Sequence, residues 1–221
     1  MPSFIWLYFL LREDARHPEP KRLIAFAFFA GMLTVLIVIP FEQFVRTYVL
    51  SDFSVMIGWA TIEEVAKYAV AALCLFWRRD VDEAPDYVIY MLTVALGFAA
   101  AENTLFILTP FLNGDLANGF LTSDMRFLGS TLLHVVASAT IGFSLAFSAG
   151  YRAEGRILSA ALGLILAIAL HTAFNTIIMT GGTSTTVALF LTWTVAVAFF
   201  AAFEVLKYFQ YRNFPNTTSS S

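Results

Sequence analysis

Long apolar runs alternate with short charged stretches along almost the whole chain. Six runs approach the roughly 20 residues that an α-helix needs to cross about 30 Å of hydrocarbon. A shorter apolar run, Pro2–Leu11, precedes them. The six longer runs are Leu23–Pro40, Ser54–Trp77, Tyr87–Phe111, Arg126–Ala149, Ile157–Met179 and Val187–Leu206. This pattern predicts an all-α polytopic membrane protein, a bundle of six full transmembrane helices plus a short N-terminal apolar segment.

Composition agrees with this fold class. The 221 residues are 59% hydrophobic and only 13% charged, whereas soluble domains are about one-quarter charged. The net charge of -3 gives no reason to expect a nucleic-acid partner, and the single cysteine, Cys74, excludes a disulfide within the chain. Because no internal repeat is evident, residues 1–212 are predicted to form a single transmembrane domain. The polar residues 213–221 are predicted to be a disordered tail.

The basic residues predict an orientation. Counting Pro2–Leu11 as the first run, ten of the 13 Lys and Arg residues follow the odd-numbered runs. Only two, Arg46 and Arg126, lie in the alternate loops. Because loops rich in Lys and Arg stay in the cytoplasm, the N-terminus is predicted outside and the C-terminal tail in the cytoplasm. The short first run is then a full or a partial crossing.

Six ionisable side chains interrupt the predicted spans. They are Glu63, Glu64, Lys67, Glu102, His134 and His171. A charge at the bilayer centre costs roughly 2.5–3.5 kcal/mol, so four charged groups would cost on the order of 10 kcal/mol unless paired or neutralised. Intramembrane ionisable residues therefore indicate a functional site, although ion pairs and hydrogen bonds that join helices are the alternative.

The spacing of these residues predicts that they lie together. Glu64, Glu102, His134 and His171 all fall about 12–15 Å below the predicted outer surface, at 1.5 Å per residue. Four helices of alternating direction would thus contribute to one layer. Lys67 can reach either glutamate of its own helix.

Two further polar residues are expected to support this layer. Asn175 shares a helix face with His171, and Asn103, beside Glu102, is expected to make a polar contact between helices.

This set of residues suits the activation of water. A carboxylate can take a proton from water as the water attacks an amide carbonyl, while His171 and Asn175 donate hydrogen bonds to the developing oxyanion. Alternatively, His134, His171 and Glu64 form a His₂Glu zinc site, although no H-E-x-x-H motif is present. A proton-coupled transporter is a third interpretation, because carboxylates and histidines also form proton relays; no inverted repeat supports it.

Four motifs, each in its own predicted span, carry a family resemblance. In chain order they are Glu63-Glu64-x-x-Lys67, Gly97-Phe98-x-x-x-Glu102-Asn103, His134 and His171-x-x-x-Asn175. This pattern resembles the PrsW family of intramembrane proteases, within the superfamily of CAAX prenyl proteases and bacteriocin-processing membrane proteins. The superfamily also resembles the Aph-type scaffold subunit of gamma-secretase, so a non-catalytic scaffold is a further alternative.

The resemblance implies a function. It implies an endopeptidase of a bacterial or archaeal plasma membrane that cuts membrane-anchored proteins near the outer face, for instance by site-1 cleavage of an anti-sigma factor. It also implies that Glu63 or Glu64 supplies the catalytic carboxylate and that Lys67 holds one of them. Which glutamate is the base, and whether a metal takes part, stay open.

Overall fold

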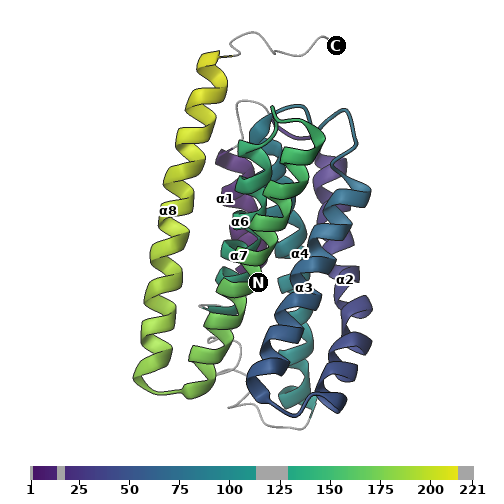
Figure 1. Ribbon diagram of the computed structural model, residues 1–221, viewed down its shortest axis with the longest axis vertical. Coiled ribbons are helices and arrows are strands. Elements are labelled where there is room, and N and C mark those ends of the chain that lie inside the picture. The colour runs from purple at the N-terminus through teal and green to yellow at the C-terminus, as the bar shows by residue number, and fades with distance from the viewer. Residues whose placement is uncertain (1, 14–17, 113–128, 214–221) are drawn as a thin grey trace.

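The computed structural model describes residues 2–13, 18–112 and 129–213, and these residues are helical apart from short turns (Figure 1). The helices are α1 (Pro2–Glu13), α2 (Lys21–Tyr48), α3 (Asp52–Cys74), α4 (Ala84–Leu112), α6 (Thr131–Phe147), α7 (Ala153–Thr180) and α8 (Thr183–Asn213). The described part contains no strand, so the predicted all-α class is confirmed. The predicted tail lies outside the described residues except for Asn213, which ends α8.

By length and composition, fewer than six of the described helices qualify as full membrane spans. Four described helices, α2, α4, α7 and α8, are both long and apolar enough to cross a membrane. α3 has 23 residues, but Glu63, Glu64 and Lys67 fall inside it and lower its apolar character. α6 has 17 residues, Thr131–Phe147, and the predicted start of this span at Arg126 lies outside the described residues. Length and composition therefore support a helical membrane protein but not six full spans.

α2 is longer than its apolar run. The run stops at Pro40, yet the helix continues through Pro40 to Tyr48. A proline inside a helix leaves one carbonyl without its usual donor but does not always end the helix. This extension carries Glu42 and Arg46 onto α2 and brings them near the predicted layer of ionisable groups.

α4 lies at the packing centre of the bundle, where it contacts α2 and α6. A Cβ atom on Gly97 would come within 1.9 Å of the Phe28 carbonyl oxygen, and one on Gly31 within 2.1 Å of the Val94 carbonyl oxygen. Only glycine allows two helix backbones to approach so closely. This crossing fixes how α4 is rotated and therefore where Phe98 and Glu102 point.

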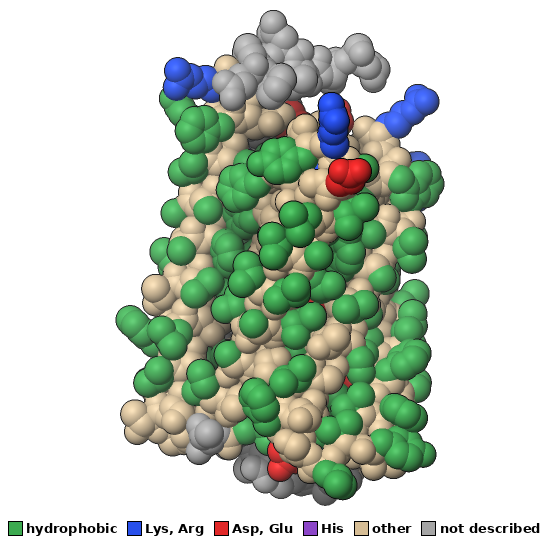
Figure 2. Space-filling view, viewed as in Figure 1, with side chains coloured by type: hydrophobic (Ala, Val, Ile, Leu, Met, Phe, Trp, Pro, Cys, Tyr) green, Lys and Arg blue, Asp and Glu red, His purple; other side chains and the backbone are tan. Residues whose placement is uncertain are grey.

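The surface separates a broad apolar zone from two polar ends. Figure 2 shows hydrophobic side chains over most of the visible face, with Lys and Arg side chains at the upper end. Basic residues stand at the starts of α2 and α7 and at the ends of α3 and α8, which share that end in Figure 1: Lys21, Arg22, Arg78, Arg79, Arg152, Arg156, Lys207 and Arg212. The predicted segregation of basic residues is thus present in the fold.

Candidate active site

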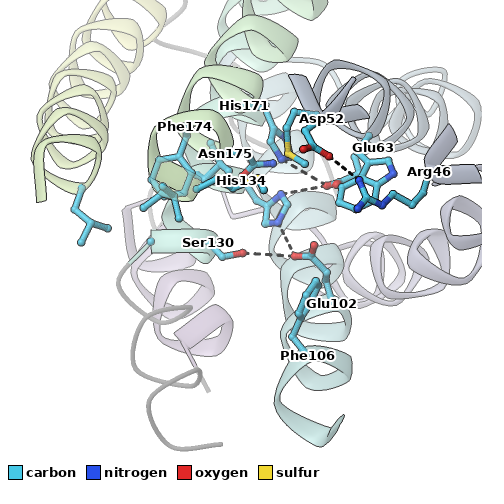
Figure 3. Close-up of a pocket in the computed structure, with 17 residues that line it drawn as sticks. Arg46, Asp52, Glu63, Glu102, Phe106, Ser130, His134, His171, Phe174 and Asn175 are labelled. Carbon is cyan, nitrogen blue, oxygen red and sulfur yellow. Dashed lines mark hydrogen bonds and ion pairs between the residues drawn. The ribbon is translucent and has the colours of Figure 1, made fainter. Parts of the chain in front are cut away.

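A cavity of about 520 Å³ penetrates the bundle from the end opposite the basic residues. Its outer part is lined by Arg46 and Asp52, which form an exposed ion pair at 2.9 Å across the α2–α3 turn. Its inner part is lined by polar groups from α3, α4, α6 and α7: Glu63, Glu102, His134, His171 and Asn175 (Figure 3). The fold therefore unites the four predicted motifs around one cavity.

Glu63 and Glu64 point to different places, because neighbours on a helix differ in direction by about 100°. Glu63 lines the cavity and is 5% exposed. Glu64 is 0% exposed and contacts Lys67 and His171 in the interior. Glu63 is therefore placed to contact a molecule in the cavity, whereas Glu64 is placed to hold other side chains in the interior.

Lys67 joins two of the motifs. Its Nζ donates to Glu64 Oε1 at 2.5 Å and lies 3.1 Å from His134 Nδ1. The ammonium group also lies over the Phe98 ring, 4.8 Å from its centroid. The sequence allowed Lys67 to reach either glutamate, and in the structure its partner is Glu64.

Each imidazole ring is oriented by a carboxylate. His171 Nδ1 lies 2.8 Å from Glu64 Oε1, and His134 Nε2 lies 2.9 Å from Glu102 Oε2. Because a carboxylate accepts, each of these ring nitrogens is assigned as the N–H donor. The other nitrogen of each neutral ring then carries a lone pair.

Those two lone-pair nitrogens face the same oxygen. Glu63 Oε2 lies 3.9 Å from His134 Nδ1 and 3.9 Å from His171 Nε2. Within the part of the chain that the structure describes, this buried oxygen has no hydrogen-bond partner. One donor atom from each of the three residues lies within 4.8 Å of the others. Buried carboxylate and imidazole groups converging in this way are the donor set of a His₂Glu metal site.

The group that could hold a metal contains Glu63 and not the glutamate that the sequence analysis named. The prediction combined His134 and His171 with Glu64. In the structure the carboxylate that faces both lone-pair ring nitrogens is Glu63, although Lys67 Nζ also lies 3.1 Å from the one on His134. Glu64 instead accepts from the N–H side of His171. The difference arises from the rotation of α3, which the spacing of residues along the chain does not determine.

Two supporting residues lie where the sequence predicted polar contacts. Asn103 Nδ2 donates to Thr131 Oγ1 at 2.9 Å and so joins α4 to α6, as expected. Asn175 lines the cavity one helical turn from His171 and is half-buried.

Three residues around the site were not anticipated. The Glu42 side chain interacts with the Glu63 side chain, and the Glu42 backbone carbonyl accepts from Trp59 Nε1 at 3.0 Å. Ser130 Oγ lies 3.5 Å from Glu102 Oε2. Glu42 was missed because the apolar run ends at Pro40, and Trp59 because a tryptophan in an apolar run gives no sign of a polar role.

Taken together, the bundle and the buried Glu–His cluster define a polytopic membrane protein with a hydrolase-type site. Residues 19–203 match the sequence model of the PrsW family, described as PrsW family intramembrane metalloprotease. Since this match covers most of the chain, the protein belongs to the PrsW family.

Three relatives named Protease PrsW are similar to this chain. Protease PrsW of Geobacillus kaustophilus (strain HTA426) is 29% identical over 150 residues, which are 64% of this chain and 61% of the relative. Protease PrsW of Bacillus subtilis (strain 168) is 21% identical over 80% of this chain and 79% of its own length. Protease PrsW of Clostridioides difficile (strain 630) is 26% identical over 81% of this chain and 76% of its own length. No solved structure matches the chain.

Proposed function

We propose that this protein is an intramembrane endopeptidase that hydrolyses a peptide bond in membrane-anchored protein substrates. The observation that carries the proposal is the Glu63 carboxylate. It is buried at the inner part of a cavity, faces two carboxylate-oriented imidazoles, and has an oxygen without a partner among the described residues. Membership of a protease family and the names of the three relatives support the same reaction.

The donor set fits a zinc ion. Two ligands of a tetrahedral zinc ion lie about 3.3–3.5 Å apart. Glu63 Oε2 lies 3.9 Å from each ring nitrogen and all three donor atoms lie within 4.8 Å of one another, so a small inward shift of the side chains would bring them to ligand spacing. Glu63, His134 and His171 would hold the metal, and Glu64 and Glu102 would orient the histidines, as carboxylates commonly do for metal-bound histidine. When bound, the ion would polarise the substrate carbonyl and favour the ionisation of a water molecule.

Metal binding by His134 requires the Lys67 ammonium group to move away from it. Its Nζ lies 3.1 Å from His134 Nδ1, the nitrogen that would bind the metal. The ammonium group would therefore turn fully toward Glu64, with which it already forms a 2.5 Å ion pair. In this scheme Lys67 and Glu64 are positioning residues that hold His171 and neutralise each other inside the bundle.

Glu102 is proposed as the proton carrier. It is the second carboxylate in the inner part of the cavity, and its side chain is 19% exposed. As the water oxygen bonds to the carbonyl carbon, Glu102 takes the proton from the water. It then gives that proton to the amide nitrogen as the carbon–nitrogen bond breaks, which yields a carboxylic acid and an amine.

Asn175 is proposed to stabilise the tetrahedral intermediate. Its side-chain amide lines the cavity on the same face of α7 as His171. A neutral donor aimed at the developing oxyanion stabilises the transition state more than the substrate. His171, which the sequence analysis paired with Asn175 in this role, is better placed as a metal ligand, because its N–H is donated to Glu64.

We propose the number of membrane spans and the orientation that the sequence predicts. We propose that α3 and α6 also cross the bilayer, because both pack within the apolar bundle beside the four long apolar helices. The basic end then faces the cytoplasm of a bacterial or archaeal cell, and residues 213–221 form a cytoplasmic tail on a single domain of residues 1–212. The cavity, which lies at the other end, would open to the outside.

The proposed substrate class follows from this arrangement. A site that opens to the outside of the membrane would cut a single-span protein close to its outer end. An anti-sigma factor cut at site 1, as the family resemblance implied, is a candidate of this kind.

Cleavage in a defined membrane tests the proposed function. Purified protein in liposomes should cut a single-span substrate into two fragments that mass spectrometry assigns to one peptide bond. Glu63→Gln should abolish this cleavage, whereas Glu154→Gln, which changes an exposed glutamate at the start of α7, should not. Proton flux that depends on Glu102, without any cleavage, would overturn the proposal in favour of a transporter.

A further inference from the structure

The Glu–His cluster lies between two walls of different character. Figure 3 shows Arg46 and Asp52 on one side of the cluster, whereas Phe174 lies on the other side, toward α8. Among the described residues that line the cavity, Lys, Arg, Asp and Glu occur only on α2, α3 and α4. A substrate bound at the cluster therefore meets charged groups on one side and an apolar wall on the other.

The apolar wall is formed by α6, α7 and α8. Its side chains line the cavity and pack together as one apolar cluster: Leu133, Phe174, Ile178 and Leu189. Leu133 directly precedes His134 in the chain, and Phe174 follows His171 by about one helical turn. The wall thus borders the catalytic groups.

The Phe174 ring has no room to move back from the cavity. A Cβ built on Gly129, just before α6, would lie 3.1 Å from Phe174 Cζ and 3.1 Å from Leu189 Cδ2. The ring therefore packs directly against the Gly129 backbone, and its side chain is only 8% exposed. Because a packed interior does not yield easily to added volume, the ring is a fixed boundary of the cavity.

We propose that Phe174 limits the size of the substrate residue next to the scissile bond, on the side that leads to the membrane span. The inference rests on the proposed protease function. The scissile carbonyl must lie at the Glu–His cluster, and the side chain of an adjoining residue starts only about 2.5–4 Å from the carbonyl carbon. That side chain therefore reaches the wall that stands one helical turn from His171.

The different character of the two walls determines which adjoining residue meets Phe174. The exposed ion pair of Arg46 and Asp52 lies at the mouth, where the water-soluble part of the substrate would leave the cavity. The part that leads into the span is apolar, and apolar side chains are buried most favourably against an apolar surface. Phe174 therefore faces the residue on the span side of the scissile bond, and Arg46 and Asp52 face the residues on the mouth side.

A pair of substrates tests the size limit. The residue on the span side of the scissile bond is Leu in one single-span substrate and Trp in the other. The value of kcat/KM should be about tenfold or more lower for Trp, which is too large for the space in front of the ring. The same exchange on the mouth side is the control and should change kcat/KM little. Equal tolerance of Trp on both sides would overturn the inference.

A variant with a smaller side chain tests the role of Phe174. Phe174→Ala should raise the Trp-to-Leu ratio of kcat/KM at least tenfold, because removing the ring makes room for Trp. Phe143→Ala is the matched control, since Phe143 is also a buried phenylalanine but does not line the cavity. It should leave the ratio unchanged. Phe174→Leu, a milder change, should raise the ratio by a smaller factor if Phe174→Ala does not fold. A ratio that neither Phe174 variant changes would overturn the inference.

Substrate binding separates this inference from the proposed function. In the Glu63→Gln background the substrate is bound but not cut, and the Leu substrate should bind about tenfold more tightly than the Trp substrate. Adding Phe174→Ala should remove this difference. If the wild type cuts neither substrate, the proposed function fails, and the two affinities still decide whether Phe174 sets a size limit. Cleavage at equal rates and with equal affinities would overturn the size limit and leave the protease function standing.

Discussion

The two sides of α3 at mid-helix show how one short motif can serve two purposes. On one side Glu63 faces a cavity and the lone-pair nitrogens of His134 and His171. On the other side Glu64 and Lys67, each 0% exposed, form a 2.5 Å ion pair. The first environment leaves a carboxylate available for chemistry, whereas the second uses a carboxylate to neutralise a buried cation. Adjacent residues of the same type are therefore expected to respond differently to the same substitution.

The largest effect is expected at Glu63. Glu63→Gln keeps the size of the side chain but removes its charge, so the turnover rate should fall by a factor of about 10⁴. The free energy of unfolding should change by less than about 1 kcal/mol, because no ion pair inside the bundle is broken. Cleavage assays and denaturant titration in detergent measure the two quantities. A large loss of stability with little loss of turnover would reverse the roles assigned to the two sides of α3.

The second-largest effect is expected at Glu64, and it is mainly a loss of stability. Glu64→Gln leaves Lys67 charged and buried without its partner, which should cost about 3–5 kcal/mol of unfolding free energy. Lys67→Met added to Glu64→Gln should recover most of this loss, since an uncharged pair replaces the broken one. The double variant should stay poorly active, because Glu64 no longer orients His171. Thermal unfolding of the wild type, the single variant and the double variant measures these differences in stability. Equal stability of all three would contradict a buried ion pair between Glu64 and Lys67.

A smaller effect is expected at Asn175. Asn175→Ala removes a proposed oxyanion donor and should lower kcat by about a hundredfold. KM should stay close to its wild-type value, because the interaction is made in the transition state. Asn103→Ala is the matched comparison, since Asn103 bonds to Thr131 between helices. It should lower stability more than it lowers kcat.

The smallest effect is expected at Glu42. Its side chain interacts with the Glu63 side chain, but Glu42 lies at the edge of the site and is only half-buried. Glu42→Gln retains hydrogen-bonding capacity and should reduce turnover by less than about tenfold, which is the loss of roughly one ordinary hydrogen bond. A loss as large as that of Glu63→Gln would make Glu42 part of the catalytic group.

The sequence predicted the cluster well, because hydropathy and spacing carry that information. Each charged residue in an apolar run stands out because burying its charge in the membrane is costly in free energy. The position of each residue within its run predicted that Glu64, Glu102, His134 and His171 lie at one depth. In the structure Glu64 contacts His171, and Glu102 contacts His134. The expected bond made by Asn103 is also present.

The rotation of the helices could not be predicted in the same way. Which of Glu63 and Glu64 faces the cavity depends on how α3 packs against its neighbours. Contacts such as the close crossing of α2 and α4 at Gly31 and Gly97 join residues far apart in the chain. The extension of α2 beyond Pro40, which brings in Glu42, depends on packing as well. These features arise from tertiary contacts that periodicity does not record.

The metal content of the purified protein tests the central claim most directly. If Glu63, His134 and His171 form the metal site, elemental analysis should find about one zinc ion per chain in active wild-type protein. Glu63→Gln should lose most of this zinc at the same protein concentration. Glu64→Gln should bind zinc about 10–100-fold more weakly, as expected for a residue that orients a ligand. Full activity without zinc, or a zinc content that Glu63→Gln does not change, would contradict the account.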